Sequence, residues 1–171
     1  MKKNTLRALS LIMTILFSST TFAATCYVAD IDIRGEYTGA CINGQAHGEG
    51  ISIGKDKYEG NFTYGRTDGK GVYTWATGEI YSGDWRDGRR TGKGVLTYPS
   101  GSKYEGEYRN DKRNGLGKLV LVKSDQESIN SWQNEKKGQW IDNVYVVEGV
   151  FIDGDLHISC NINNIQSCVT H

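Results

Sequence analysis

The thiol and imidazole side chains, which are the commonest zinc ligands, are four cysteines and three histidines in this sequence. They are Cys26, Cys41, Cys160, Cys168, His47, His157 and His171. Structural zinc sites usually take cysteine ligands from a C-x-x-C-type pair, and this sequence has neither such a pair nor matching histidine spacing. An even number of cysteines without that spacing is typical of disulfides, so we expect no metal site.

Two other groups of residues resemble catalytic motifs only superficially. Residues 88–94 contain glycines and a lysine, as a phosphate-binding loop does, but no Ser or Thr follows Lys93 and the segment leads into a β-type run. The acidic residues Asp84, Glu105 and Glu107 alternate as solvent-facing side chains of strands do, which does not favour a paired acid and base. No Ser, His and Asp set stands out. We therefore expect a non-enzymatic protein with no catalytic residues and no cofactor.

The dominant pattern is a 23-residue repeat marked by Tyr58, Tyr81 and Tyr104. Each tyrosine opens a Tyr-x-Gly-x-aromatic phrase, and Gly-x-Gly begins eleven residues later. Tyr37 opens a first copy that is two residues shorter. Repeats of this length cannot bury an apolar face alone, so the copies must stack on one another.

Each copy has the pattern of a β-hairpin. In Tyr81-Ser82-Gly83-Asp84-Trp85, shared residues alternate with polar ones, which is the period of a strand. The run that follows Gly-x-Gly, such as residues 95–98, is rich in β-branched and aromatic residues and predicts the second strand. The turn is expected seven residues after each tyrosine, at Gly44, Gly65, Gly88 and Asp111. We expect the glycines between the rings to act as packing spacers.

This pattern resembles the MORN repeat family over residues 37–122, although Cys41 replaces the aromatic residue of the first copy. The resemblance implies an all-β fold, an elongated and curved antiparallel sheet of stacked two-stranded hairpins. It also implies a role in scaffolding, dimerisation or membrane association, including binding of anionic lipid. The residues that we expect to pack the repeats together are Tyr58, Gly60, Phe62, Tyr81, Gly83, Trp85, Tyr104, Gly106 and Tyr108.

Outside the repeats we expect three segments: a signal peptide over 1–23, an N-terminal capping strand over 24–36 and a C-terminal cap over 123–171. Ser124 to Glu127 has the form of a capping box and predicts a short helix near 124–135. Gly138-Gln139-Trp140 resembles the opening phrase, with Lys136 in place of the tyrosine. A degenerate fifth hairpin is therefore expected to continue from Val144 to Ile152.

The first 23 residues predict export. Basic residues precede the apolar run from Ala8 to Phe17, and Thr21-Phe22-Ala23 supplies small residues for a signal peptidase. The run is shorter than the roughly 20 apolar residues that span a bilayer, so no transmembrane segment is expected in the mature chain. Thr25 fits poorly before a lipidated cysteine. These features are typical of an exported, bacterial-type protein that is periplasmic or secreted.

The cysteine pairing follows from the stacking. Four stacked hairpins would separate the ends of the sheet by roughly 40 Å, from a strand spacing of about 4.8 Å. Disulfide-bonded residues have Cα atoms within about 7 Å of each other. Local pairs are therefore expected, Cys26 with Cys41 and Cys160 with Cys168.

Charge distribution suggests one candidate binding surface. The chain has 20 basic and 20 acidic residues, and loss of Lys2, Lys3 and Arg7 would leave 17 basic ones, a net charge of about −3, which argues against a nucleic-acid partner. Basic residues nevertheless gather around successive turns and could form a rim for an anionic partner. The simpler interpretation, which we favour, is that they are solvated side chains that protect the turns and the sheet edge. The rim residues are Arg86, Arg89, Arg90, Lys93, Arg109, Lys112 and Arg113.

Two functions stay open. The first is an exported, non-catalytic protein-interaction or self-association scaffold, whose partner is another protein or a second copy in a homodimer. The alternative is a peripheral module that binds anionic lipid or lipopolysaccharide through the basic rim. The aromatic face could fold into its own trough or leave rings exposed for a partner.

Overall fold

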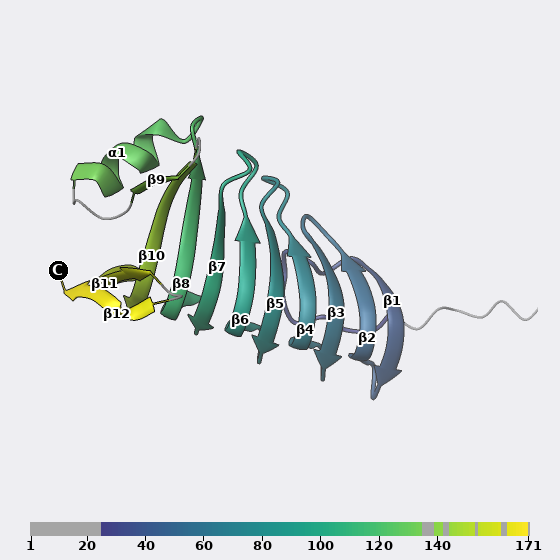
Figure 1. The fold of residues 1–171 in the computed structure, drawn as a ribbon. Coiled ribbons are helices and arrows are strands. Elements are labelled where there is room, and N and C mark those ends of the chain that lie inside the picture. Colours follow the sequence, from purple (N-terminus) through teal and green to yellow (C-terminus); the bar gives the residue numbers. More distant parts are fainter. Residues whose placement is uncertain (1–24, 135–138, 142–143, 153, 162–163, 171) are drawn as a thin grey trace, which may run out of the picture.

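The strands of the protein form one antiparallel sheet whose order follows the chain. The computed structural model describes residues 25–134, 139–141, 144–152, 154–161 and 164–170 (Figure 1). The sheet order is β1 to β8, then β10, β11 and β12, and β9 pairs with β10 outside this path. The strands are β1 Glu36–Ile42, β2 Gln45–Ile53, β3 Lys57–Thr63, β4 Arg66–Thr74, β5 Ile80–Arg86, β6 Arg89–Thr97, β7 Lys103–Arg109, β8 Lys112–Val122, β9 Gln139–Ile141, β10 Val144–Ile152, β11 Asp155–Asn161 and β12 Asn164–Thr170. The predicted all-β fold of stacked hairpins is confirmed.

Tight turns close the four repeat hairpins. At each turn two successive residues have positive φ, as in Asp87 at 50° and Gly88 at 79°. Type I′ turns require this conformation at both central residues, and their twist matches that of the flanking strands. The fourth turn reaches it without glycine, since Asn110 and Asp111 have φ values of 49° and 69°.

A continuous row of glycines crosses the sheet at the middle of the strands. In every ladder between β1 and β8, a glycine of one strand pairs with a glycine of the next, and Gly117 of β8 pairs with Gly149 of β10. This glycine row consists of Gly39, Gly50, Gly60, Gly71, Gly83, Gly94, Gly106, Gly117 and Gly149. Shifting one strand by a single residue would reverse its two faces, so the row marks the shared register of all the repeats.

The short helix α1, Gln126–Asn134, follows the last repeat. The Ile129 N–H donates to the Asp125 carbonyl at 3.0 Å, so Asp125 precedes the helix as its N-cap. The Asp125 carboxylate accepts hydrogen bonds from the hydroxyls of Ser100 and Ser102. These bonds attach the start of the helix to the turn between β6 and β7. The predicted helix is confirmed, with its cap one residue after Ser124.

The fifth hairpin has a different register from the predicted one. β10, not β9, lies beside β8, and Gly149 stands opposite Gly117. Val147 therefore takes the place of the repeat tyrosine and Phe151 that of the second ring, with Gly154 seven residues after Val147. The phrase expected with Lys136 in the tyrosine position lies partly outside the described residues, and in the described part the buried Val147 takes that position instead.

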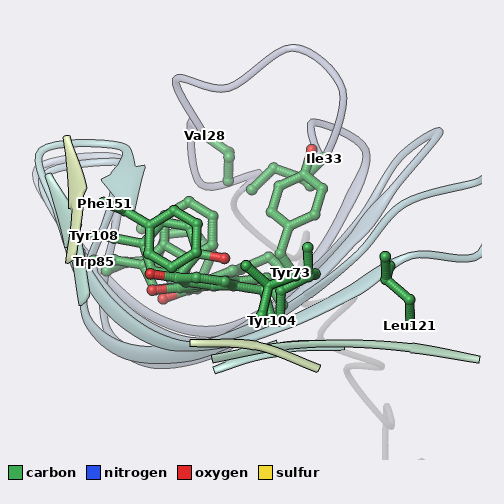
Figure 2. Packing of buried hydrophobic residues seen from close by; sticks show 14 of the residues in the cluster. Val28, Ile33, Tyr73, Trp85, Tyr104, Tyr108, Leu121 and Phe151 are labelled. Carbon is green, nitrogen blue, oxygen red and sulfur yellow. The ribbon is translucent and has the colours of Figure 1, made fainter. Parts of the chain in front are cut away.

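Residues 25–35 cover one face of the first repeats without forming a strand. Tyr27 makes an isolated parallel bridge to Gln45, and the rest of the segment consists of bends and turns. Val28 and Ile33 are buried, and Figure 2 shows them above the rings around which the strands curve. The capping strand expected over 24–36 is thus an irregular cap, which we call the N-terminal cap.

Candidate functional site

The rings of the repeats form an unbroken chain of contacts on one face of the sheet, which we call the inner face. From Tyr58 onward, each repeat tyrosine meets the second ring of its own strand and that of the next repeat edge to face; the Tyr81 ring, for example, lies 5.2 Å from Trp85 and 5.1 Å from Tyr108. This ring ladder runs through Tyr37, Phe62, Tyr58, Trp85, Tyr81, Tyr108, Tyr104 and Phe151. Edge-to-face pairs each add about 0.5–1.5 kcal/mol beyond burial. The ladder therefore couples neighbouring repeats.

The tyrosine rings lie against the glycine row. A Cβ on Gly71 would come within 2.2 Å of the Tyr58 hydroxyl, and one on Gly94 within 2.4 Å of the Tyr81 hydroxyl. Each hydroxyl donates to the backbone carbonyl three residues later; the Tyr81 bond to the Asp84 carbonyl measures 3.1 Å. Burial raises the pKa of Tyr104 to about 12, and a nearby Arg113 offsets part of this rise. The rings are thus neutral packing elements at ordinary pH.

The inner face is closed over most of its length. Every member of the ring ladder from Tyr58 to Phe151 is at most 6% exposed. Over the first repeats the N-terminal cap covers these rings, and the Ser52 hydroxyl donates to the Ile33 carbonyl at 2.7 Å. A disulfide joins Cys26 to Cys41 across a Cα–Cα distance of 5.8 Å, which confirms that predicted pair. Of the two interpretations of the aromatic face, the structure shows the self-buried one.

The seven residues of the expected basic rim do not share one surface. Arg90 turns inward, where its guanidinium lies 5.4–5.6 Å from the ring centroids of Trp75, Tyr81 and Tyr108. It also pairs with Asp111, with 3.2 Å between Nε and Oδ1. Arg113 lies over Tyr104 and Phe151 in the same way. Lys93 is exposed on the opposite face of the sheet.

Four cations remain at the hairpin ends. Arg86, Arg89, Arg109 and Lys112 are all exposed. Neighbouring turns are joined by backbone bonds, since the Gly88 N–H donates to Thr67 and the Asp111 N–H to Arg90. Arg86 stands directly opposite Arg89, and Arg109 opposite Lys112. Like charges placed opposite each other destabilise a strand pair, and an anion between them would relieve the repulsion.

The face opposite the rings, which we call the outer face, carries a groove of about 1160 Å³. It crosses the sheet from Thr38 of β1 to Lys118 of β8, and the glycine row forms its floor. Two rows of outward side chains form its walls, with aliphatic members at Ile51, Val72, Val95 and Leu116. Val72 and Leu116 are 38% and 36% exposed, so apolar surface remains available for contact. We call this feature the outer groove.

Charges along the outer groove are matched within the sheet. Lys93 stands opposite Glu107 and Glu105 opposite Lys118, while Lys70 Nζ lies 2.6 Å from Asp84 Oδ1. Partial burial alone would raise the pKa of Asp84, but hydrogen bonds from the Lys70 side chain and the Lys93 N–H lower it overall. A groove with such paired charges favours a ligand of mixed character over a polyanion.

Comparison with protein families agrees with this geometry. The model of the MORN repeat matches residues 37–57, 58–80, 81–103, 104–126 and 137–156, more than half of the chain. The chain belongs to the MORN repeat family. No curated protein matches it in sequence. MORN repeats generally act as modules that interact with proteins or membrane lipids, and the family is a non-catalytic one.

Two remaining expectations concern metal ions and membranes. In the described residues, no three His, Cys, Asp or Glu side chains lie close enough together to hold a metal ion. No helix of those ranges combines the length and apolar character needed to cross a bilayer. The side chains of Cys160 and Cys168 lie outside the described part of the chain, so their disulfide stays a prediction.

The main feature that sequence reasoning missed is the outer groove. The residues that could have indicated it lie between the ring and glycine positions that recur in each copy. They include Glu59, Val72 and Val95, which alternate with the inward side chains. The position of Glu59 varies among the copies, and that of Val72 and Val95 is aliphatic in three of the four, but the ring and glycine pattern drew no attention to either. Outward positions vary because solvent tolerates many side chains, whereas the inner positions must fit the ring ladder.

Proposed function

We propose that this protein is an exported, non-catalytic scaffold of the MORN repeat family that binds another polypeptide along its outer groove. The observation that carries the proposal is that the two faces of the sheet differ in their accessibility. The rings of the inner face are buried, whereas the outer face keeps a groove of about 1160 Å³ across the repeats. A partner that uses the length of the sheet would therefore meet the outer groove.

The character of the groove supports a polypeptide partner. Exposed aliphatic side chains such as Val72 lie beside charged residues of both signs. Protein interfaces combine an apolar centre with a polar rim, and they need electrostatic complementarity more than one dominant charge. The Cys26–Cys41 disulfide supports export, because disulfides persist mainly in oxidising compartments.

Site-specific photo-cross-linking tests this proposal. A photoreactive residue at Val72 or Val95 is expected to form adducts with a partner in the compartment to which the protein is exported. The control places the same residue at Thr77, an exposed turn position outside the groove. The captured protein is then purified and titrated against the scaffold. Adducts from Thr77 alone, or none from either groove position, would rule out the groove as the binding surface.

A second candidate function is binding of an anionic lipid surface through Arg86, Arg89, Arg109 and Lys112. It is favoured by Arg86 and Arg89, which are exposed and stand directly opposite each other at one hairpin end. Vesicles with anionic headgroups should retain the protein at low salt and release it as ionic strength rises. Arg89→Glu with Arg109→Glu should abolish retention, whereas protein that stays in the supernatant at low salt would exclude this function.

A further inference from the structure

Strand β1 forms one edge of the sheet. Among the described strands it pairs with β2 alone, so its other side presents unpaired backbone N–H and C=O groups. The N-terminal cap does not occupy this side, because its backbone bonds go to Gly44, Ala46, Gly65 and Asp56, beyond β1. Proteins usually protect such an edge with charged residues, proline or a bulge, since an open edge can recruit another strand.

β1 is the least charged of the four equivalent repeat strands, although it is the one at the edge. Its outward residues in the repeat phrase are Thr38, Ala40 and Ile42. The same positions in the interior strands are all polar and mostly charged: Glu105, Glu107 and Arg109 of β7, Ser82, Asp84 and Arg86 of β5, and Glu59, Asn61 and Thr63 of β3. Glu36, which precedes the phrase, is the one charged residue of β1, so the edge strand has less charge protection than the interior strands.

Apolar side chains are exposed at the same end of the sheet. Ile42 and Ile53, on β1 and β2, are 42% and 46% exposed, and Tyr27 and Ile31 of the N-terminal cap are 49% and 76% exposed. Ile42 and Ile53 lie at opposite ends of the β1–β2 pair, because Ile42 stands opposite Gln45 and Ile53 opposite Glu36, so both ends of the edge expose an apolar residue. The edge and its surroundings thus share the properties of an unfilled interface.

The free side of β1 is also the regular side of the strand. In each repeat hairpin the register shift lies between its two strands, as at Gly39/Ala40 of β1 and Gly60/Phe62 of β3. The ladders that join one hairpin to the next, such as β2 with β3, have no shift. β1 therefore exposes the side by which β3, β5 and β7 attach to the preceding hairpin.

We propose that β1 pairs antiparallel with β1 of a second copy of this chain, with Gly39 opposite Gly39 of the partner subunit. This register continues the glycine row through the two-fold axis. Thr38 then lies opposite Ala40 of the partner subunit and Glu36 opposite Ile42 of the partner subunit, so no like charges meet. The inference rests on the proposed function in one respect, since it names a self-association surface for the scaffold.

The opposite end of the sheet does not fit β1 equally well. Gly149 of β10 is the last member of the glycine row, because Ser159 of β11 stands opposite it. β12, Asn164–Thr170, contains no glycine. A head-to-tail contact between β1 and β12 would interrupt the row, whereas β1 with β1 continues it and closes a symmetric dimer.

Sedimentation velocity over a wide concentration range tests the dimer. The full chain is expressed with its own first 23 residues in an export-competent host and purified in the oxidised state. We expect a reversible monomer–dimer equilibrium. Thr38→Lys with Ala40→Lys places two lysine pairs opposite each other across the axis and should weaken dimerisation by at least about tenfold. The matched control, Asn61→Lys with Ser82→Lys, adds the same charges at equivalent interior positions and should leave the dimer unchanged.

The register is tested by oxidative cross-linking. A mixture of Thr38→Cys and Ala40→Cys proteins should give a cross-linked heterodimer faster than either protein alone, because these two positions face each other in the proposed pair. Peptide mapping verifies that Cys26–Cys41 stays intact, and the near-ultraviolet signal of the ring ladder verifies folding.

The results distinguish failure of the β1 pairing from failure of the proposed function. A protein that stays monomeric at every concentration, or a dimer that both lysine variants leave unchanged, overturns the β1 pairing. Groove cross-links from Val72 would persist in either case if the scaffold proposal holds. Loss of those adducts with a normal β1 dimer would instead reject the groove and keep the dimer. A cross-link from position 38 to a different protein would show that a foreign strand fills the edge.

Discussion

Replacing Gly94 with alanine should destabilise the sheet strongly, although the change adds one methyl group. An ideal Cβ at this position would lie 2.4 Å from the Tyr81 hydroxyl and 2.5 Å from two carbons of its ring. Favourable contacts between carbon atoms lie at about 3.5–4.0 Å, so the ring must move by about 1 Å or more. Tyr81 is fully buried and touches Trp85 and Tyr108, which leaves it little room to move.

The cost combines three effects. Overpacking of a well-filled core costs about 1–3 kcal/mol. Loss of the Tyr81 hydrogen bond to the Asp84 carbonyl adds about 1 kcal/mol, and weakened ring contacts add about 1 kcal/mol. Alanine recovers about 0.5–1 kcal/mol because it loses less backbone entropy than glycine on folding. The free energy of unfolding should therefore fall by about 3 kcal/mol.

Denaturant unfolding followed by tryptophan fluorescence measures this change, with coincident far-ultraviolet signals as the check of two-state behaviour. The control is Gly88→Ala, where nothing lies within 4 Å of the added Cβ and the positive φ alone costs about 1–2 kcal/mol. A Tyr81→Val background removes the ring, with Val147 of the fifth hairpin as a precedent. In the Tyr81→Val background, Gly94→Ala should leave the free energy of unfolding almost unchanged. An equal cost in both backgrounds would refute the role of Gly94 as a space for the Tyr81 ring.

Three further predictions concern the disulfides and the tyrosines. Cys26→Ser with Cys41→Ser should lower the free energy of unfolding by about 3 kcal/mol, the chain-entropy value for a loop of this length, as measured by calorimetry or denaturant titration; an unchanged midpoint would contradict it. Mass mapping of the non-reduced protein should find Cys160 linked to Cys168, and free thiols at either position would disprove that pair. Because burial raises the pKa of Tyr104 to about 12, the folded state holds its proton longer than the unfolded state does. Stability should thus be full below about pH 10 and decline as pH rises through 12, and ionisation of Tyr104, followed through the NMR signals of its ring, should appear together with loss of ellipticity; ionisation of Tyr104 at pH 10 in folded protein would contradict this.

The inner face could be predicted from sequence because its requirements repeat. The ring positions, the glycines opposite them and the turn glycines all recur at the same spacing, since each repeat packs against a copy of itself. The fifth hairpin was harder to place. Val147 satisfies the same packing position by size and burial without sharing the aromatic chemistry, so a pattern based on tyrosine passed over it.

Whether an arginine side chain reaches the basic surface depends on the face of the strand to which it points, which net charge does not describe. Arg89 and Arg90 are adjacent in sequence, and the alternation of a strand sends their side chains to opposite faces. Ala46 and Thr67 occupy the position of Arg90 in the earlier repeats and are buried, which indicated an inward site. Treating all turn cations as one rim therefore overestimated the basic surface.

Position 41 links the cap, the ring ladder and the edge of the sheet. Where the other repeats place a second ring, the first repeat has Cys41, and the ladder consequently begins at the contact between Tyr37 and Phe62. The bond to Cys26 anchors the N-terminal cap at this gap, and the cap supplies Val28 and Ile33 as the apolar cover that another repeat would have provided. Among the described residues, the cap thus terminates the stack on its inner face, whereas none covers the backbone edge of β1 or the outer groove. A terminal repeat that covers its rings but leaves Glu36 as the one charge of its edge strand is suited to pairing with another strand, since repeat proteins usually protect both the rings and the edge of a terminal unit.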